Sequence, residues 1–578
     1  MSREFSKGIF KFMSFKQTPN APWKKYYKSE EMNFKVPDIS IYNYFEKKAS
    51  LYGDLNAIDY CGRKIKYSEL LEKVDRCAKS FYFNGIRAGD VVTLIMSNTP
   101  EAVISFLALN KIGAISNMIH HLSSENEIKK TIISTNSKML LIIDYVYEKV
   151  KKILKATNLL KVIVVKTNNA MPLVANLEYN ISHLFDYNLP KNSNFYVCWN
   201  DFFYSSNDIN VSDYKRNTKK NTPAVMIHSG GSTGVPKAIM ISNGNFVTFS
   251  IQSGIIYKEI EIGDKNLAMM PIFHGFGLAT NVYFPLTMGM EVILIPRFQA
   301  SKFEKILNDY KPEFVMAVPT IYEEMLKIDN NNLDMSNLKY ALSGGDILKK
   351  SLEDRINDFF LAHNSKVKIS CGFGMSEALT GVVCETNEVN RDGTVGIPLP
   401  GCYVGIFSSD DQELPYDQDG EICISGPNVM LGYYNNIKET NLALHVHDDG
   451  NIWLHSGDIG SMDKDGFITY KGRIKRMIVT SGYNVYPSQI EELLETHPAI
   501  MLCNVVGVPD SRKGEVIKAY IVLNKGFLPF PALIKNFKKL CEKNLPKYAH
   551  PSDYEFRKSL PRTIVGKIDF KALQDENR

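Results

Sequence analysis

Residues 229–237 carry the side chains best suited to phosphate chemistry, in the order Ser-Gly-Gly-Ser-Thr-Gly-Val-Pro-Lys. Glycines let backbone N–H groups approach phosphate oxygens closely, and the hydroxyls and the ammonium add donors. The pattern is not the common nucleotide-binding loop, because Pro236 stands where that loop has glycine and no Ser or Thr follows the lysine. Apolar runs at 224–228 and 238–241 predict a strand on each side. A phosphate-binding turn between two strands is therefore favoured, with an ordinary surface turn as the alternative.

Five later segments have side chains that could complete a nucleotide site. Residues 372–377 offer an aromatic ring for a purine and a carboxylate for Mg²⁺. Residues 343–346 offer glycine backbone for a close approach, and 456–458 could accept hydrogen bonds from ribose hydroxyls. Residues 472–475 add cations, and 561–567 end in a lysine on a predicted turn. Taken singly, each segment is equally typical of a turn or a solvated surface.

The composition limits the class of protein. The chain has 578 residues, 44% of them hydrophobic and 23% charged, which indicates several domain-sized units with large cores. A net charge of only +5, with no basic stripe or nucleic-acid motif, excludes a polynucleotide partner. The nine cysteines are scattered and never form a C-x-x-C pair, which favours free thiols in a reducing, cytoplasmic location. No apolar run reaches the roughly 18–20 residues that span a bilayer.

Helix and strand patterns alternate from about residue 40 onward. Apolar positions between Ser68 and Gly85 recur at helical spacing, so we expect a helix capped by Ser68 and stopped at Gly85. A strand at 91–95, a helix after Pro100 and an apolar run at 112–119 follow. This order predicts parallel strands joined by helical crossovers, and thus an α/β fold.

The two ends of the chain differ from this pattern. Residues 1–21 form a basic leader that could make a weak contact with a membrane surface, and a packed terminus is the alternative. Residues 475–578 read as a small α/β unit of normal domain size. In it, Ser488 and Glu491 form a predicted capping box for a helix after Pro487. Strands are predicted at 503–508, 519–523 and 554–556, and a helix at 531–544.

In order and spacing, these segments together resemble the adenylate-forming (AMP-binding) superfamily, in its acyl-CoA synthetase and fatty-acid–CoA ligase branch. The resemblance runs from about residue 22 to the end of the chain. It implies a large AMP-binding domain of packed α/β subdomains at 22–474 and a small mobile lid domain at 475–578 that carries the catalytic lysine. It also implies ATP, Mg²⁺ and CoA as cofactors and a small-molecule carboxylic acid as substrate. A homodimer is left open.

The resemblance also assigns roles to single residues. It implies that Lys567 reaches the reacting carboxylate and the α-phosphate, and that Thr233 and Glu377 lie at the metal. His274 resembles an aromatic gate of the acid pocket, with a core histidine as the alternative. Lys475 resembles the hinge about which the lid rotates, and Phe373 stands where the family usually has Tyr beside adenine. The implied cofactor-binding residues are Ser229, Gly230, Gly231, Ser232, Thr233, Gly234, Lys237, Gly344, Gly345, Gly372, Phe373, Gly374, Met375, Ser376, Asp458, Arg473, Lys475 and Gly482.

The nature of the acid is indicated by what one segment lacks. Residues 271–277 resemble the family's acid-pocket segment, and no Asp or Glu lies between Lys265 and Met290. Amino-acid-activating relatives place a carboxylate there, because a buried unpaired ammonium is costly. An uncharged tail is therefore favoured, first a medium- or long-chain fatty acid and next an aryl or coumarate-type acid.

The thiol acceptor is expected to be free CoA, because only eleven residues follow Lys567 and leave no room for a fused carrier domain. A ligase that loads a separate acyl carrier protein is the alternative. A family member that binds nucleotide without catalysis is a further one. Intact Lys237, Glu377 and Lys567 argue for the enzyme, an AMP-forming acid–thiol ligase.

Overall fold

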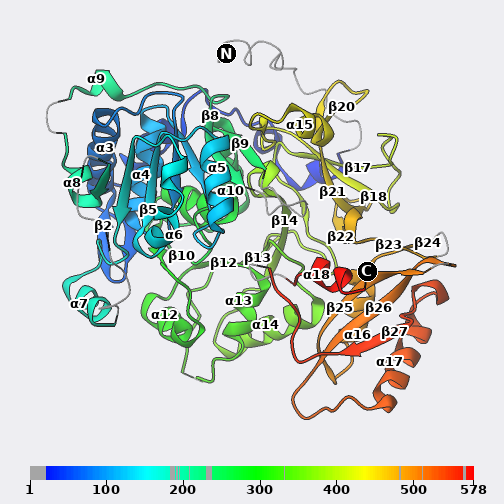
Figure 1. Ribbon diagram of the computed structural model, residues 1–578. Helices are drawn as coiled ribbons and strands as arrows, with labels where there is room; N and C mark the ends of the chain where they lie inside the picture. The colour runs from blue at the N-terminus through cyan, green and yellow to red at the C-terminus, as the bar shows by residue number, and fades with distance from the viewer. Residues whose placement is uncertain are drawn as a thin grey trace. The chain divides into compact units, whose positions relative to one another are not determined.

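The structure is a computed structural model (Figure 1), which describes residues 21–182, 189, 193, 195–206, 209–228, 237–330, 332–480, 483–510, 512–563 and 568–577. By their internal contacts the residues divide into two compact units. Unit 1 comprises Met1–Leu348, Asp354–Val404 and Ile424–Leu454, and unit 2 comprises Lys349–Glu353, Gly405–Cys423 and His455–Arg578. This division cuts through continuous strands, so the domain boundary expected at residue 475 stays a prediction.

Two large sheets form the framework of unit 1. In strand order, the nine-stranded sheet consists of β16 (Ile397–Pro398), β15 (Gly381–Cys384), β14 (Ser370–Gly374), β13 (Tyr340–Ser343), β12 (Phe314–Ala317), β10 (Lys265–Ala268), β11 (Glu291–Leu294), β1 (Asn56–Tyr60) and β2 (Arg63–Lys66). The eight-stranded sheet consists of β19 (Gly432–Tyr433), β9 (Ala238–Ser242), β8 (Pro223–His228), β4 (Ile115–Met118), β3 (Val91–Ile95), β5 (Met139–Ile143), β6 (Lys161–Val165) and β7 (Tyr196–Cys198).

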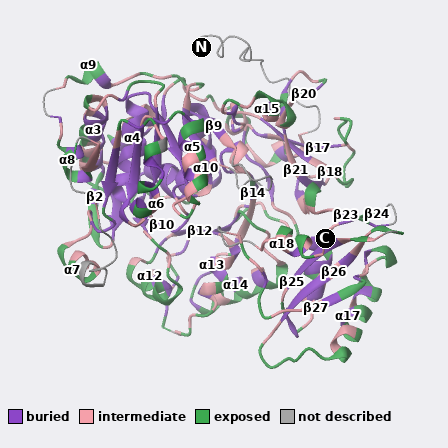
Figure 2. Ribbon diagram, viewed as in Figure 1, coloured by how far each residue is buried: buried purple, intermediate pink, exposed green. Residues whose placement is uncertain are grey.

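The inner strands of both sheets are parallel. The run from β8 through β4, β3, β5 and β6 to β7 is parallel throughout, as is the run from β14 through β13, β12, β10 and β11 to β1. Every residue of β3 and β5 is buried, as Figure 2 shows by the purple of the inner strands. Parallel sheets need helices on their faces to reach this burial. The predicted α/β fold is therefore confirmed.

Helices connect and cover these strands. They are α1 (Ser29–Met32), α2 (Ile41–Ala49), α3 (Tyr67–Phe83), α4 (Pro100–Lys111), α5 (Glu125–Ser134), α6 (Tyr147–Lys151), α7 (Leu173–Ser182), α8 (Trp199–Phe203), α9 (Val211–Tyr214), α10 (Asn243–Ile256), α11 (Phe284–Thr287), α12 (Phe303–Tyr310), α13 (Pro319–Met325), α14 (Lys350–Ala362) and α15 (Ile437–Ala443). Within the described ranges, none is long and apolar enough to cross a membrane.

The start of α3 differs from its prediction. The buried stripe of Leu70, Val74 and Phe81 lies where the spacing predicts it. The helix, however, begins at Tyr67, and its N-cap residue is Lys66, which makes no capping bond through its side chain. Ser68 lies inside the first turn, so its predicted capping role is wrong. The apolar positions locate a helix more reliably than one polar residue locates its first turn.

A smaller five-stranded sheet, crossed by the division between the units, contains β17 (Tyr403–Phe407), β18 (Gly420–Ser425), β21 (Ile452–Met462), β20 (Leu444–Val446) and β22 (Ile468–Arg473). The last sheet lies wholly in unit 2 and contains β24 (Tyr483–Val485), β23 (Ile478–Thr480), β26 (Gly514–Leu523), β25 (Ile500–Asp510) and β27 (Asp553–Phe556). The helices of unit 2 are α16 (Pro487–Glu495), α17 (Pro531–Asn544) and α18 (Phe570–Asp575). The strands and the 531–544 helix predicted for this part of the chain are confirmed.

The capping box predicted for α16 is wrong. The N-cap residue of α16 is Tyr486, and no side chain caps the helix. Ser488 instead donates its hydroxyl to the carbonyl oxygen of Lys471 at 2.5 Å. Glu491 accepts from the backbone N–H of Val505 at 2.8 Å and pairs with Arg476. Tertiary partners have thus taken both side chains of the predicted box.

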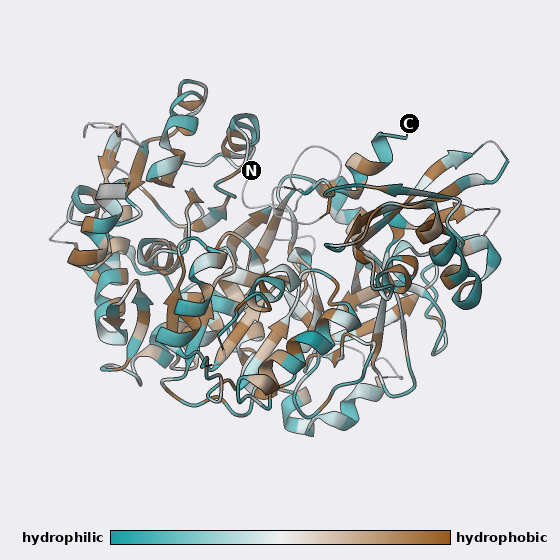
Figure 3. Ribbon diagram, turned by 90° about the horizontal axis from the view of Figure 1, so that it is seen from below, coloured by the Kyte–Doolittle hydropathy of each residue, from teal (hydrophilic) through white to brown (hydrophobic). Residues whose placement is uncertain are grey.

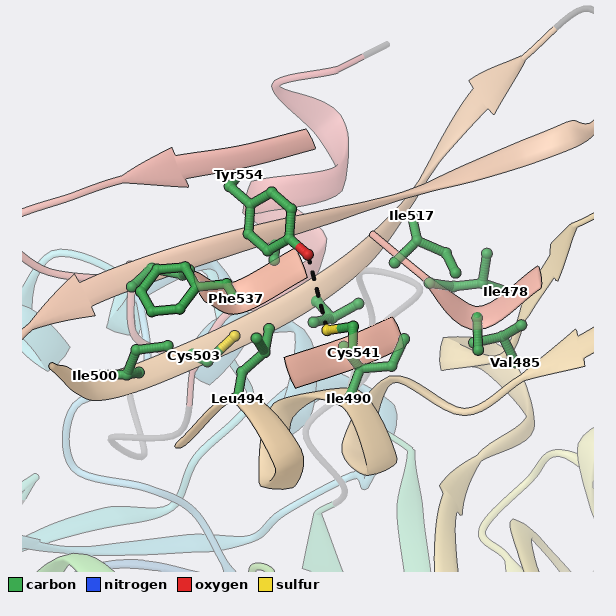
Figure 4. Packing of buried hydrophobic residues seen from close by; sticks show 14 residues of the cluster. Ile478, Val485, Ile490, Leu494, Ile500, Cys503, Ile517, Phe537, Cys541 and Tyr554 are labelled. Carbon is green, nitrogen blue, oxygen red and sulfur yellow. Dashed lines mark hydrogen bonds between the residues drawn. The ribbon is translucent and has the colours of Figure 1, made fainter. Parts of the chain in front are cut away.

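One buried cluster holds the sheet and helices of unit 2 together (Figure 4). Phe537 and Cys541 of α17 and Ile490 and Leu494 of α16 are all 0% exposed, and Tyr554 donates a hydrogen bond to Cys541 Sγ at 3.8 Å. In Figure 3 many strands are brown, that is hydrophobic, whereas many helices carry teal, hydrophilic residues. Unit 2 therefore has a hydrophobic core of its own.

Truncation of this core gives a first prediction. Phe537→Ala should lower the free energy of unfolding of unit 2 by about 3–5 kcal/mol, because the lost ring leaves a cavity. Chemical denaturation of the full chain, with hydrogen exchange read in β25 and β26, measures the change. The control is Leu528→Ala, a residue 60% exposed, which should shift stability by less than about 0.5 kcal/mol. Equal effects of the two substitutions would contradict the cluster's role.

Candidate functional site

The candidate residues of unit 1 follow the carboxyl ends of parallel strands. His274 follows β10, Gly344 and Gly345 follow β13, and Glu377 follows β14. In the other sheet, the segment 229–237, which the sequence predicts to bind phosphate, comes directly after β8 in the chain. Because parallel strands end at the same edge of their sheet, loops far apart in sequence are gathered there, where α/β proteins generally bind ligands.

Asn98 joins the carboxyl edges of the two sheets. It follows β3 of the eight-stranded sheet and is 3% exposed. Its Nδ2 donates to the carbonyl oxygens of Ala268 at 3.1 Å and Met270 at 3.0 Å, and its Oδ1 accepts from the backbone N–H of Ile272 at 2.9 Å. These three backbone groups lie at the end of β10 and just beyond it. The segment that leads to His274 is thus held by the buried amide of Asn98, together with Asn281, whose Oδ1 accepts from the backbone N–H of Met270 at 3.2 Å.

Lys237 and Glu377 meet at Tyr433. The hydroxyl of Tyr433 donates to Glu377 Oε1 at 2.9 Å, and Lys237 Nζ lies 4.7 Å from the centroid of the Tyr433 ring. Lys237 also forms an ion pair with Glu439. Burial, with the nearby charge of Glu377, raises the pKa of Tyr433, so its hydroxyl keeps its proton and remains a donor. The pairing of β19 with β9, which aligns Tyr433 with Ile239, places the phenol here.

Tyr433 and Glu439 are site residues that the sequence analysis missed. Tyr433 lies 56 residues after Glu377, and neither residue belongs to a spacing pattern typical of nucleotide sites. The place of Tyr433 at the site follows from the pairing of β19 with β9, a tertiary contact that the sequence does not reveal. The structure brings Lys237 and Glu377 together as expected for one site, but it does so through side chains that no motif includes.

The glycines near the expected purine position make close backbone contacts. A Cβ on Gly374 would lie 2.0 Å from the carbonyl oxygen of Thr380, so no larger residue fits there. A Cβ on Gly344 would lie 3.6 Å from the Phe276 ring and 3.8 Å from the carbonyl oxygen of Gly372. Gly345 has φ +80°, a conformation that favours glycine. At Gly374 the backbone of β14 therefore packs directly against the chain at Thr380, whereas Gly344 lies at ordinary contact distance from its neighbours.

The remaining residues of that segment have defined places. Phe373 lies within β14 and is only 8% exposed, so its ring is largely covered. Met375 is the N-cap residue of a short 3₁₀ turn, Ser376–Ala378, which contains Ser376 and Glu377. The backbone N–H of Met430 donates to the carbonyl oxygen of Glu377 at 2.8 Å. The turn is thus tied to the chain just before Tyr433.

His274 belongs to a cluster of aromatic rings. Its ring centroid lies 4.6 Å from Phe273 and 6.4 Å from His120, the latter pair edge to face. His120 lies 4.1 Å from Phe273, while His121 meets Phe273 and Tyr145 edge to face at 5.6 Å each. His120, His121 and Tyr145 follow β4 and β5, and no motif in the sequence indicated them. We call these five residues the ring cluster.

Two histidines of the ring cluster, His120 and His121, are held neutral. Burial lowers the pKa of His120 to about 3, helped by His121, His274 and Lys149. Burial, with the charges of Lys149 and Arg297, lowers the pKa of His121 to about 4. The backbone N–H of Leu122 donates to Nδ1 of His120 at 2.9 Å, which leaves the ring proton on Nε2. His120 and His121 are therefore uncharged at neutral pH.

His228 is the last described residue before the predicted phosphate-binding loop, and its side chain is held by hydrogen bonds. Its Nε2 lies 2.6 Å from Oδ1 of Asn117, whose Nδ2 donates to Thr93 at 2.8 Å and to Thr135 at 3.3 Å. Burial lowers the pKa of His228 to about 4, so the ring is neutral and donates to the amide oxygen. This network fixes the end of β8, from which the loop begins.

Three of the expected residues that the structure describes belong to unit 2. Asp458 lies in β21, is 3% exposed and forms an ion pair with Arg473 at 3.3 Å. Tyr470 donates a further hydrogen bond to Asp458 at 3.3 Å. Lys475 lies in the 3₁₀ turn Ile474–Arg476 that follows β22. The pairing of β21 with β22 therefore brings Asp458 and Arg473 together.

Several expected residues lie outside the described part of the chain. They are Ser229, Gly230, Gly231, Ser232, Thr233, Gly234, Gly482 and Lys567. Their assignments stay predictions, as do the roles given to the described candidates.

Two sequence families match the chain. One, described as AMP-binding enzyme, matches residues 45–434, and the other, described as AMP-binding enzyme C-terminal domain, matches residues 489–567. The long-chain-fatty-acid–CoA ligase of Bacillus subtilis is 29% identical over 565 residues, which are 96% of this chain and 98% of that protein. Probable 4-coumarate–CoA ligase 3 of Dictyostelium discoideum is 30% identical and covers 85% of this chain and 86% of its own.

Solved structures show the same fold. The anthranilate CoA ligase AuaEII in complex with anthranoyl-AMP superposes with a TM-score of 0.80 at 21% identity, over 95% of this chain and 99% of that one. ATP-bound MatB from Rhodopseudomonas palustris also has a TM-score of 0.80, at 22% identity, over 93% of this chain and 98% of its own.

The neutral histidines give a prediction for pH. The unfolded chain takes up protons near pH 6.5, whereas folded His121 resists protonation down to about pH 4. Between these values the unfolded state binds more protons, so stability falls as the pH drops. His121→Phe keeps a ring and removes this titration. It should reduce the stability lost between pH 7.5 and 5.0 by up to about 2 kcal/mol.

Denaturant titrations of both proteins at the two pH values measure this difference. Equal losses for wild type and His121→Phe would show that His121 is not held neutral.

Proposed function

The chain belongs to the AMP-binding enzyme family, and from that membership we propose that it is an ATP-dependent acid–CoA ligase. The membership confirms the predicted superfamily and the prediction that the protein is an enzyme of the ligase class. We assign it a medium- or long-chain fatty acid, which it would activate as the acyl-adenylate and then transfer to CoA. ATP, Mg²⁺ and CoA are the proposed cofactors.

The acid assignment rests on similarity and on charge. The similarity to a long-chain-fatty-acid–CoA ligase extends over 96% of this chain. The chain between Lys265 and Met290 has no carboxylate, and its side chains Leu278, Val282 and Phe284 are at most 1% exposed. An apolar tail needs no charged partner, whereas a substrate ammonium would be left unpaired.

In the first half-reaction, the acid carboxylate would attack the α-phosphorus of ATP and expel pyrophosphate. Two negatively charged groups must meet, so cations and N–H donors have to stabilise the charge. Lys237 is the last residue of the segment 229–237. We assign Lys237 and the N–H groups of this segment to the β- and γ-phosphates. Lys567 is assigned to the attacking carboxylate and the α-phosphate, with Asp458 and Arg473 at the ribose.

Glu377 suits a Mg²⁺ ion. Tyr433 donates to only one carboxylate oxygen, so the group keeps acceptor capacity, and Mg²⁺ typically takes one or two carboxylates together with substrate phosphates. A bound Mg²⁺ would neutralise charge on the nucleotide phosphates. Tyr433 would orient the carboxylate for this task.

In the second half-reaction, the thiol of CoA would attack the acyl carbonyl and release AMP. The acyl-adenylate is a mixed anhydride that water can destroy, so the acid must lie in a dry site. His120 and His121 of the ring cluster are neutral and the ring faces are apolar, and we assign the cluster to the wall beside the reacting carboxyl group.

An aryl or coumarate-type acid is the second candidate substrate. The 30% identity to a probable 4-coumarate–CoA ligase and the aromatic rings beside His274 favour it. A separate acyl carrier protein is the alternative acceptor.

An acid panel tests the proposed function. Purified protein with ATP, Mg²⁺ and CoA should release AMP with octanoate and palmitate at least tenfold faster than with acetate or coumarate. Faster release with coumarate would support the aryl candidate. Adenylate formation that stalls with CoA and proceeds with acyl carrier protein would change the acceptor. No acid-dependent release of AMP would contradict the ligase assignment.

Lys567→Ala separates the two half-reactions. It should slow adenylate formation about 10²–10³-fold, as for loss of one transition-state donor, because no cation then bridges the two anions. Thioester formation from supplied acyl-adenylate should remain within about threefold of wild type. Lys558→Ala, at an exposed lysine of the same unit, is the control and should affect neither half. Equal loss of both halves would rule out the role given to Lys567.

A further inference from the structure

Glu421 holds the turn of β21 that precedes Asp458. The residue lies in β18, the neighbour of β21 in the five-stranded sheet. Its Oε1 accepts from the backbone N–H of Gly457 at 2.7 Å. Its Oε2 lies 2.8 Å from Nδ1 of His455, which is the donor because a carboxylate can only accept. One side chain therefore binds the chain one residue and three residues before Asp458, with one oxygen for each bond.

A hydroxyl and a glycine fix the rest of this turn. The hydroxyl of Ser456 donates to the carbonyl oxygen of Ile422 at 2.5 Å and accepts from the backbone N–H of Asp458 at 3.0 Å. Gly457 has φ +71°, in the left-handed region that favours glycine. The path of residues 455–457 is thus set by two consecutive residues of β18.

The carboxylate of Asp458 depends on this path for its direction. Asp458 is buried, and its Oδ1 contacts the Tyr470 hydroxyl and Arg473 Nε at 3.3 Å each. A buried carboxylate keeps the direction that its backbone gives it, since a rotation would separate the charge from its partners. A shift of the backbone at Gly457 therefore moves the carboxylate itself.

Two further groups face the His455 ring. Sγ of Cys423 lies 3.5 Å from Nδ1, and Oδ1 of Asp411 lies 3.6 Å from Nε2. Neither replaces Glu421, because a thiol is a weak acceptor and Asp411 meets the other ring nitrogen. Loss of the Glu421 carboxylate would therefore release the ring as well as the N–H of Gly457.

We propose that Glu421 is a positioning residue that aims Asp458 at the ribose hydroxyls of ATP and so makes the protein select ribonucleotides. The inference rests on the proposed function, which assigns Asp458 to the ribose. Glu421 acts through the backbone, since its two oxygens bind His455 and Gly457. A site built to bind a hydroxyl rejects the analogue that lacks it, provided that the acceptor is held in place.

Equilibrium binding of nucleotides to the full-length protein tests the proposal. Titration calorimetry with Mg²⁺ and without acid compares ATP with 2′,3′-dideoxy-ATP, which lacks both ribose hydroxyls. Wild type should bind ATP at least tenfold more tightly, and Asp458→Asn should reduce this preference to less than about twofold. Glu421→Gln keeps the size of the side chain but removes one acceptor. It should reduce the preference at least fivefold through weaker binding of ATP, with the affinity for the dideoxy nucleotide within about twofold of wild type.

A second carboxylate of unit 2 supplies the matched control. Glu495 accepts from the backbone N–H of Cys503 at 2.7 Å and pairs with Lys349, so Glu495→Gln also removes one acceptor from a largely buried place. This control should prefer ATP as strongly as wild type does. Equal losses of affinity for both nucleotides in Glu421→Gln would indicate a purely structural role and overturn the proposal. An unchanged preference in Glu421→Gln would overturn it as well.

A double variant shows whether Glu421 acts through Asp458. In the Asp458→Asn background, Glu421→Gln should change the affinity for ATP by less than about twofold, because the group that it positions is already altered. Independent, additive losses would overturn the path through Asp458.

The outcome for the proposed function is read separately. If no acid supports AMP release while wild type still prefers ATP in binding, the ligase assignment fails and this inference stands. If wild type binds both nucleotides equally, this inference fails and AMP release is unaffected. Binding of neither nucleotide would overturn the ribose assignment and this inference together.

Discussion

The buried amide of Asn98 links the carboxyl edges of the two large sheets, which a buried hydrogen bond from Tyr60 to Thr167 also connects. Its three hydrogen bonds go to backbone groups at the end of β10, 170 residues or more along the chain. Hydrogen bonds of this kind are strong in a low-dielectric interior, and leaving the partners unpaired would be costly. The position of Phe273 and His274 against His120 follows from this connection. The ring cluster is thus formed jointly by segments from both sheets.

Charge explains the arrangement around Tyr433. The proposed reaction brings a carboxylate to a polyphosphate, so the site needs cations that do not collapse onto nearby acids. Lys237 is paired with Glu439, while Glu377 is held by a neutral phenol and keeps a free oxygen. One cation and one carboxylate are therefore kept apart by a ring. The ring cluster, to which we assign the acid, differs in charge from the surroundings of Tyr433. The neutral imidazoles of His120 and His121 would face an apolar acid and a labile anhydride without adding charge.

Sequence patterns predicted elements well and their ends poorly. The runs at 91–95, 224–228 and 531–544 are regular elements in the structure, because hydrophobic period and length are local properties. Ser68 and the pair Ser488 and Glu491 were wrong as caps. A polar side chain near the start of a helix has several possible hydrogen-bond partners. Ser488 and Glu491 bind backbone groups of Lys471 in β22 and Val505 in β25 instead of capping their helix. Local rules cannot rank such partners.

The sequence by itself determined the α/β class and the family and predicted which residues bind nucleotide, since these inferences depend on composition, order and spacing along the chain. The tertiary structure alone decided which side chains meet. Tyr433, Glu439, His120 and His121 belong to no motif, and each acquires its place from strand pairing or from a shared sheet edge. The physical reason is range: periodicity is set by neighbours within a few residues, whereas Glu377 and Tyr433 become partners only after segments 56 residues apart have packed.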